Sequence, residues 1–533
     1  MIEPRRPVRR WVTLAATIVV GFPCGSAPAA VDQTQEIGLR ECLAQAMRSN
    51  PELRIEQLSL TRSSWAIRGA RAAFWPAITA ETGLGLGSYP SLESADGSGF
   101  RRLAYQLGLG GLLPLGTTYQ LGLNGTVTWS EGTSSATSGG ATADTATYSA
   151  GLLSPEHTPG LALTLTQPLL RGAWLEANLG PLRVARADHR VARAQFTRFV
   201  HDLLHRVARA YYELHAARRL HAIAEQGVDL ARRQLSRTRL AARGGKSSGL
   251  DLLESELALA RRHQQRISAE QSVLGAERAL RELLFNRRRP GEKIGFGGTL
   301  VPRGSPLPPG EPLALEKLAA RALKRRPDLE ALALQLDARH HELRVVENGT
   351  LPQLDAYASL TLSSLSGSGE TSEYLGEHAI GDHGSAWSQV ARARYPSFEV
   401  GLRFEWPVSR DAREAAAQQQ RVEKRRSERM LTAARSRAML EVSEAYQRLA
   451  SSRGELANAV LLRRLAQANL EGVEKKSRAG LGDAFDVIRA QENLIEAESS
   501  LVRARQAVTL SRLDLEAAGG TLPDLLEVRI SPQ

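Results

Sequence analysis

Two stretches of the chain, "RLAARGGKSSGLDLLESELALA" at residues 239–260 and "KKSRAGLGDAFDVIRAQENLIEA" at residues 475–497, share one pattern. In each, a long alanine-rich and charged sequence is interrupted by glycines and then resumes. The flanking residues favour helix, and glycine adopts the backbone conformations that a tight reversal requires. Each stretch therefore predicts the tip of a helical hairpin, with Gly245 in the first reversal and Gly480 and Gly482 in the second.

The likeness between the two stretches extends over most of the chain. Nearer the N-terminus, "SNPELRIEQLSL" at residues 49–60 corresponds to "RRPDLEALALQL" at residues 325–336. Around the hairpins, five residues recur 235 positions later in the same order: Val207, Ala210, Tyr211, Gly245 and Asp251 become Val442, Ala445, Tyr446, Gly480 and Asp486. Matches at constant spacing indicate internal duplication. We expect a first structural repeat over residues 30–300 and a second over 301–533.

The first 29 residues have the features of a secretory signal peptide. Four arginines precede an apolar run at residues 11–22, and "APA" at residues 27–29 resembles a cleavage site. Lipidation of Cys24 is the alternative, but the preceding "GFP" is a poor lipobox. With the leader removed, Cys42 is the one cysteine left, so we expect an exported protein without an internal disulfide.

Each repeat contains the same series of elements. A helix (residues 37–74 and 312–349) leads into strands of alternating apolar and small or polar residues, such as "PAITAETGLGLGS" at 76–88 and "PQLDAYASLTLSS" at 352–364. Return strands at 160–168 and 398–407 precede long helices at 176–242 and 410–478, and shorter helices at 250–287 and 484–518 complete the hairpins. The predicted fold is mainly α with a small β portion. Gly/Ser/Thr-rich segments at 88–102, 130–158 and 363–396 are predicted to be solvent-exposed loops.

One segment has no counterpart in the second repeat. "YQLGLGGLLPLGTTYQLGLNGTVTWS" at residues 105–130 alternates on both sides of "LPLGTT" and predicts an additional β-hairpin. Either this hairpin adds two strands to the sheet or it decorates the sheet from outside.

Several fragments resemble catalytic or binding motifs without their context. "GGKS" at residues 244–247 lies between two helices and lacks the earlier glycine of a phosphate loop. His201 and His205 are four residues apart, but no HExxH motif accompanies them. The net charge is +12, but arginine and glutamate are interspersed along the helices, which is typical of solvated helix faces and not of nucleic-acid binding. The sequence predicts no enzyme activity, no cofactor and no metal site.

The order of helix, strands and long helical hairpin, present twice, resembles the TolC family of outer-membrane efflux proteins. The motifs that carry the resemblance are "NPEL" at 50–53 and "RPDL" at 326–329, "AAFWP" at 72–76, "LTQPLLRG" at 165–172 and "RAGLGDAFDVIRAQENLIEAE" at 478–498. Single motifs are loose, but their order is specific and covers residues 37–520.

The resemblance implies a homotrimer in the outer membrane of a Gram-negative bacterium, with a periplasmic extension. Each protomer would contribute strands to one transmembrane β-barrel, twelve if each gives four, and helical hairpins to a periplasmic α-barrel. It implies a passive export channel of a tripartite efflux or type I secretion system. The partners would be a periplasmic adaptor (membrane fusion) protein, an inner-membrane transporter and outer-membrane lipid. Drug, metal and protein cargo are not distinguished by the sequence.

The resemblance also places a gate at the hairpin tips. Asp251 and Asp486 occupy the acidic positions, and repeated threefold each would form a ring that favours cations. Equally, each could be an acid at a helix N-terminus that stabilises the helix. Family gates carry a second carboxylate and an arginine where this chain has Arg489 and Gly482, so Arg478 is the substitute candidate for the closing contact.

A second function class fits the helices alone. A periplasmic coiled-coil adaptor or a structural envelope protein would also use long amphipathic hairpins. The strands placed between the helical halves favour the channel.

Overall fold

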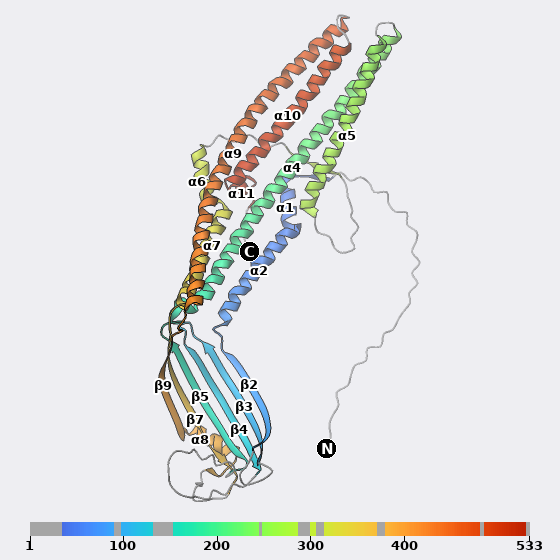
Figure 1. Ribbon diagram of the computed structural model, residues 1–533. Coiled ribbons are helices and arrows are strands. Elements are labelled where there is room, and N and C mark those ends of the chain that lie inside the picture. The colour runs from blue at the N-terminus through green and yellow to red at the C-terminus, as the bar shows by residue number, and fades with distance from the viewer. Residues whose placement is uncertain are drawn as a thin grey trace, which may run out of the picture.

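The computed structural model describes residues 35–89, 98–131, 153–244, 248–285, 299–304, 307, 314–369, 379–479 and 484–528. A β-sheet forms one end of the molecule, and long helices run away from it to the hairpin tips at the other end (Figure 1). The expected leader, residues 1–29, lies outside the described residues, as do Gly245, Gly480 and Gly482.

The helix that opens each half is broken near its start, whereas the sequence pattern predicts one helix. The first half has α1 (Leu39–Ser49) and α2 (Pro51–Ala72), and the second has α6 (Leu315–Arg325) and α7 (Pro327–Gly349). Asn50 and Arg326 separate them in extended conformations, with ψ of 122° and 120°. The cause is the following proline, which disfavours a helical conformation in the residue before it.

The long hairpins form as the sequence predicts. Helix α4 (Gly180–Arg243) has 64 residues and α9 (Asp411–Arg478) has 68, so each is a rod of about 100 Å at about 1.5 Å per residue. A short helix, α3 (Trp174–Asn178), precedes α4. The returning helices are α5 (Gly249–Phe285) and α10 (Ala484–Ala518), and each packs along its partner.

No helix in the described parts of the chain combines the length and the apolarity needed to cross a membrane.

The additional hairpin lies within the sheet, which decides between the two alternatives that the sequence leaves open. Within the described residues the order is β2–β3–β4–β5–β7–β9, and every neighbouring pair is antiparallel. The additional strands β3 and β4 are inserted between β2 and β5, while the two-residue β8 (Ser366–Gly367) pairs with the end of β5. The strand bounds are Ala77–Tyr89, Ser98–Leu112, Thr118–Glu131, Glu156–Pro168, Gln353–Ser363 and Tyr395–Glu405.

The register separates the sheet into an apolar face and a face of small and polar residues. Because side chains alternate along a strand, directly paired residues lie on the same face. One row of paired positions is Ala80, Leu107, Leu123, Leu161 and Leu362. The next row, on the other face, is Glu81, Gln106, Asn124, Gly160 and Ser363. The sheet therefore has one face suited to an apolar environment and one suited to water.

The predicted loop at residues 363–396 is wrong in part, because it contains helix α8 (His383–Ala391). Asp382 caps this helix by accepting a hydrogen bond from the Ser385 N–H (2.8 Å). The helix packs on the apolar face near the far end of the sheet, where Trp387 donates to the Tyr105 hydroxyl (3.2 Å). Likewise, the predicted loop at 88–102 is wrong at its ends, because β2 extends to Tyr89 and β3 begins at Ser98.

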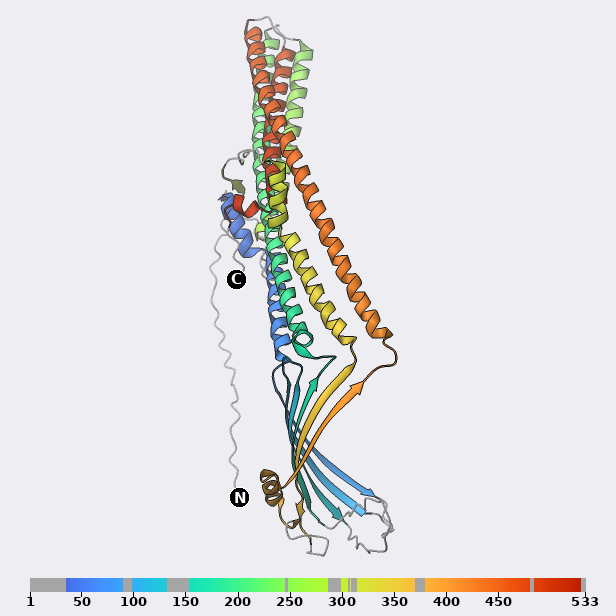
Figure 2. The same ribbon diagram turned by 90° about the vertical axis from the view of Figure 1, so that its left-hand side faces the viewer.

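The largest apolar core lies beside the middle of the long helices, in a region that we call the waist. It combines α1, α11 (Leu522–Leu525) and the parallel pair β1 (Gln35–Ile37) and β6 (Leu300–Pro302) with α4 and α5 (Figure 2). The buried carboxylate of Glu277 ties it together, because it accepts the Leu300 N–H (3.0 Å) and pairs with Arg281 (2.7 Å) and Arg218 (3.3 Å). The two halves of the chain are thus joined at mid-length.

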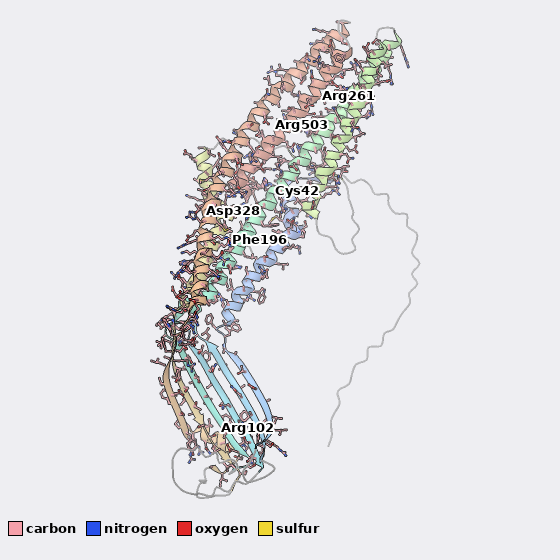
Figure 3. All side chains as sticks on the ribbon, in the orientation of Figure 1. Cys42, Arg102, Phe196, Arg261, Asp328 and Arg503 are labelled. Carbon is pink, nitrogen blue, oxygen red and sulfur yellow. The ribbon has the colours of Figure 1, made fainter. Side chains whose placement is uncertain are left out.

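The second half has an ionic anchor at the break between α6 and α7. Arg326 contacts Asp328 (2.8 Å) and Glu441 of α9 (2.7 Å), and Asp328 lies midway along the helical region (Figure 3). Partial burial alone would raise the pKa of Asp328, but the hydrogen bonds and positive charge of Arg326 outweigh it, so that pKa is lowered. The lowered pKa means that the ionised carboxylate stabilises the folded protein.

We expect Asp328→Asn to lower the free energy of unfolding by about 1–3 kcal/mol at neutral pH, because it removes a hydrogen-bonded charge. The wild-type advantage is complete above the unfolded pKa of about 3.9 and is lost as the pH falls through the lower folded pKa. Thermal unfolding of both proteins between pH 7 and pH 3 measures this. Asp337→Asn, in an exposed pair with Arg190, is the control and should have little effect. If the difference in unfolding free energy between wild type and Asp328→Asn stayed constant down to pH 3, the prediction would be wrong.

Candidate functional site

The structure brings the two predicted acidic residues to the same end of the molecule. Asp251 lies in the first turn of α5 and Asp486 in the first turn of α10, both at the hairpin tips (Figure 1). Arg478 is the last residue of α9, so its backbone lies at the same end, but its side chain is outside the described residues. The closing contact predicted for Arg478 therefore stays a prediction. The two carboxylates do lie at the tips.

Asp251 caps its helix. The Ser248 N–H donates to its carboxylate (2.7 Å), and its own N–H donates to the Ser248 hydroxyl (3.2 Å). This reciprocal pair is a capping box, which satisfies two backbone donors that a helix start leaves unpaired. Asp486 is exposed in the equivalent turn. The helix-cap interpretation thus has direct support at Asp251, and a role of its charge in the channel is compatible with these hydrogen bonds.

The two hairpins meet along a seam between α4 and α5 on one side and α10 on the other. Arg262 of α5 is buried there, with a side-chain exposure of 9%, and its guanidinium lies 3.6 Å from the Glu492 carboxylate of α10. Burial lowers the pKa of Arg262, and the carboxylates of Glu492 and Glu496 oppose that effect. Arginine nevertheless stays charged in proteins, so the seam contains a buried cation held by the opposite hairpin.

The seam is tightly packed around this contact. The space enclosed by Arg262, Gln234 and Gln491 is only about 10 Å³. A Cβ at Gly227 would lie 3.1 Å from the Ile495 side chain, so glycine permits the close approach of α4 and α10. The side-chain nitrogen of Gln491, although buried, has no hydrogen-bond partner among the described residues. Toward the waist the seam opens into a hollow of about 570 Å³.

The sequence interpretation missed Arg262, Glu492 and Gln491. Arg262 follows Ser255 by seven residues and lies on the same helix face, but the structure is what shows that this face is buried. An arginine on the buried face of a hairpin helix indicates a partner of opposite charge. The residue 235 positions later is Ala497, so the predicted duplication gave no help.

The motif fragments acquire structural explanations. His205 contacts Asp514 of α10 at 2.8 Å, which makes it a link between helices. The glycine-rich run "GLGLG" at residues 83–87, which resembles a dinucleotide-binding loop, lies inside β2 and does not open a helix. No group of three or more histidine, cysteine or acidic side chains arranged to hold a metal occurs in the described parts of the chain.

Comparison with known proteins assigns this architecture. Residues 42–284 and 318–521 match the outer membrane efflux protein family. A region of 214 residues is 26% identical to the outer membrane protein TolC of Escherichia coli (strain K12), and it spans 40% of this chain and 41% of that relative.

Two solved structures share the fold. A membrane protein from Pseudomonas aeruginosa superposes with a TM-score of 0.62 at 17% identity, covering 93% of this chain and 99% of its own. The MtrE outer membrane channel of Neisseria gonorrhoeae, described in an open state, superposes with a TM-score of 0.59 at 16% identity. The superposition covers 91% of this chain and 89% of that channel. The chain belongs to the outer membrane efflux protein family. It is an outer-membrane protein of a Gram-negative bacterium with a periplasmic extension, and its family and fold are those of channel proteins.

Substitution of Asp251 separates its two roles. Asp251→Asn keeps a side-chain oxygen for the Ser248 N–H but removes the charge, whereas Asp251→Ala removes both. If the charge acts on permeating ions, both variants should lower cation preference in bilayer recordings, and the alanine should also cost about 0.5–2 kcal/mol of stability.

Asp486→Asn tests the equivalent exposed position. If both Asp251→Asn and Asp486→Asn keep the cation preference of the wild type, the charge has no effect on permeating ions and the helix-cap role is the one that remains.

Proposed function

We propose that three copies of this chain assemble into a passive exit duct, the outer-membrane component of a tripartite efflux or type I secretion system. The strands form the membrane-spanning wall, and the hairpins extend the duct through the periplasm toward an adaptor protein and an inner-membrane transporter. We also propose that residues 1–29 are a cleaved leader and that residues 30–300 and 301–533 are the two repeats. Family membership supports this role, and the observation that carries it is the incompleteness of the single chain.

The sheet supports assembly because its outer strands lack second neighbours within the described residues. Strands β2 and β9 each pair on one side only, over 13 and 11 residues. Strands of this length are sufficient for a bilayer when tilted. In lipid, unpaired backbone groups cost several kcal/mol each, so a spanning sheet must close. Copies of the same chain supply complementary edges, since β2 and β9 run in opposite directions.

The helices support lateral packing of copies along the same two edges. Helices α2 and α5 continue the β2 side, and α9 continues the β9 side (Figure 1). These helices expose large apolar side chains. In a single chain these side chains would face water, which is unusual for so many large apolar groups. They are Ile55, Leu58 and Trp65 of α2, Leu253, Leu257 and Leu274 of α5, and Val422, Leu440, Leu461 and Leu465 of α9.

The seam between the hairpins supports a gate that opens by separating them. Its closed packing buries the charge of Arg262 and leaves the amide nitrogen of Gln491 without a partner in the described residues. Water entering the seam would satisfy the Gln491 amide, whereas the contact between Arg262 and Glu492 holds the two hairpins together. We therefore place the gate at the tips, formed by Asp251, Asp486, Arg478, Gly245, Gly480 and Gly482, and its latch at Arg262 and Glu492.

Arg262→Ala should favour the open state, because it removes the contact that α5 makes with α10. A loss of about 1–3 kcal/mol corresponds to about a 5- to 150-fold change in the open-to-closed ratio. Single-channel recording measures this as a higher open probability. Arg261→Ala is the matched control, since Arg261 is the adjacent, exposed residue of the same helix (Figure 3). Equal open probabilities in the two variants would refute the latch.

The duct itself is tested with the mature protein extracted in detergent. We expect it to insert into planar bilayers and to carry ionic current without an energy source, because a passive duct needs none. Extraction in plain buffer and an absence of current would instead support the second candidate, a periplasmic coiled-coil adaptor or structural envelope protein.

A further inference from the structure

The β3–β4 hairpin is a full part of the sheet. Strand β3 pairs with β2 from Ala77↔Gly110 to Tyr89↔Ser98, and β4 pairs with β5 from Thr118↔Thr166 to Thr128↔Glu156. The hairpin therefore separates β2 from β5 along their whole paired length. Six strands of each described chain lie side by side, where the family resemblance implied four.

The two faces of the sheet continue across the hairpin without a break. On the apolar face, Leu107 and Leu109 of β3 pair with Leu123 and Leu121 of β4. On the other face, the paired positions are small or polar, as with Gly108 opposite Gly122. A hairpin that decorated a barrel would have no reason to match both faces of the strands beside it.

The turn of the hairpin is fixed to the junction between sheet and helices. Leu115 accepts hydrogen bonds from the Trp174 N–H (3.1 Å) and from Gln167 (3.4 Å). Gly116 has a φ of +95°, and a Cβ there would lie 2.5 Å from the Gly172 carbonyl oxygen. The segment "LTQPLLRG" ends at Gly172. The hairpin turn therefore packs against the segment that connects β5 to the long helices.

From this arrangement, which rests on the trimer proposed above, we propose that the membrane wall is an 18-stranded barrel with a backbone diameter about half as large again as that of a 12-stranded one. Six strands per copy in three copies give 18, an even number, as an antiparallel closed wall requires. The edges that meet between copies are β2 of one and β9 of the next.

The calibre follows from strand spacing. With strands about 4.8 Å apart and tilted by about 40°, 18 strands give a circumference of about 110 Å and a backbone diameter of about 36 Å. Twelve strands give a diameter of about 24 Å. Three copies of α2, α4, α7 and α9 at about 9 Å spacing form a ring of about 110 Å, so the wider wall matches the helical tube beneath it.

The consequence concerns cargo. The inward face carries small residues such as Gly83, Ala104 and Gly122 together with longer ones such as Gln106 and Arg403, so the open width is smaller than the backbone diameter. An exit of this width exceeds the diameter of about 10–12 Å of a helix with its side chains. Selection by size then takes place at the hairpin tips, and the exit admits bulky polymers such as extended or helical polypeptide.

Disulfide trapping in intact membranes tests the strand order. Gly83, Ala104, Thr126 and Thr158 form one row across β2, β3, β4 and β5. Double cysteine variants at 83 and 104 and at 126 and 158 should form disulfides within the chain, because paired strands meet the Cα distance required. The Thr126 and Thr158 hydroxyls already lie 2.6 Å apart, and a Cβ at Gly83 meets no atom within 4 Å.

A cysteine pair at 83 and 158 is the matched control. In the proposed wall these positions are three strand spacings apart, about 14 Å, and no bond forms. The native Cys42 does not interfere, because burial raises the pKa of its thiol to about 12. A bond between 83 and 158 would overturn the proposal, as would failure of the 83–104 pair, and neither result would affect the trimer or its conductance.

Closure between copies is tested separately. Gly85→Cys is combined in turn with Ser397→Cys, Glu399→Cys or Arg403→Cys on the inward face of β9. In one of these registers we expect disulfide-linked species of two and three chains, and none larger than three. Intact bonds within the chain without any such linked species would overturn the 18-stranded ring and the trimer together, whereas the 83–158 bond would overturn the strand count alone.

Discussion

The hydrogen bonds that the sheet cannot make by itself constrain the rest of the molecule. Strands β2 and β9 are the edges of the described sheet, and each presents a row of backbone donors and acceptors without strand partners among the described residues. Water could satisfy these groups, but hydrocarbon cannot. This constraint is the basis for the proposal that copies of the same chain complete the sheet. The exposed apolar side chains of α2, α5 and α9, on the same two sides, extend that proposal from the sheet to the full length of the helices.

The waist of the molecule has a larger buried core than the hairpin seam. This difference suits a duct with a gate at the hairpin tips. At the waist, fully buried residues such as Leu203, Leu280 and Leu300 surround a carboxylate with three partners. At the hairpin seam, α4 and α10 pack closely at Gly227 and Ile495, and the buried Arg262 meets the partly exposed Glu492. Local opening occurs where few apolar contacts hold a region. This distribution supports the proposal that the waist keeps the two halves together while the tips part.

The sequence alone predicted the elements whose signals are long or repeated. The hairpin helices, the paired acidic residues and the alternation of the strands are of this kind. It did not predict the breaks at Asn50 and Arg326, although the prolines that cause them were visible, nor helix α8, whose Ala386 and Val390 form a stripe too short to stand out. The place of the β3–β4 hairpin could not be predicted, because alternation shows that a strand has two faces but not which strand lies beside it. Arg262 was missed because its partner is 230 residues away in another hairpin.

If one chain makes a third of a closed wall, three chains stay together outside the membrane. Native mass spectrometry of the mature protein, released from detergent micelles over a range of concentrations, measures this. We expect one dominant species with the mass of three chains that persists on dilution. A dominant single chain that remains folded in the micelle would contradict it, because that chain would have to leave both edges of its sheet unpaired in an apolar environment.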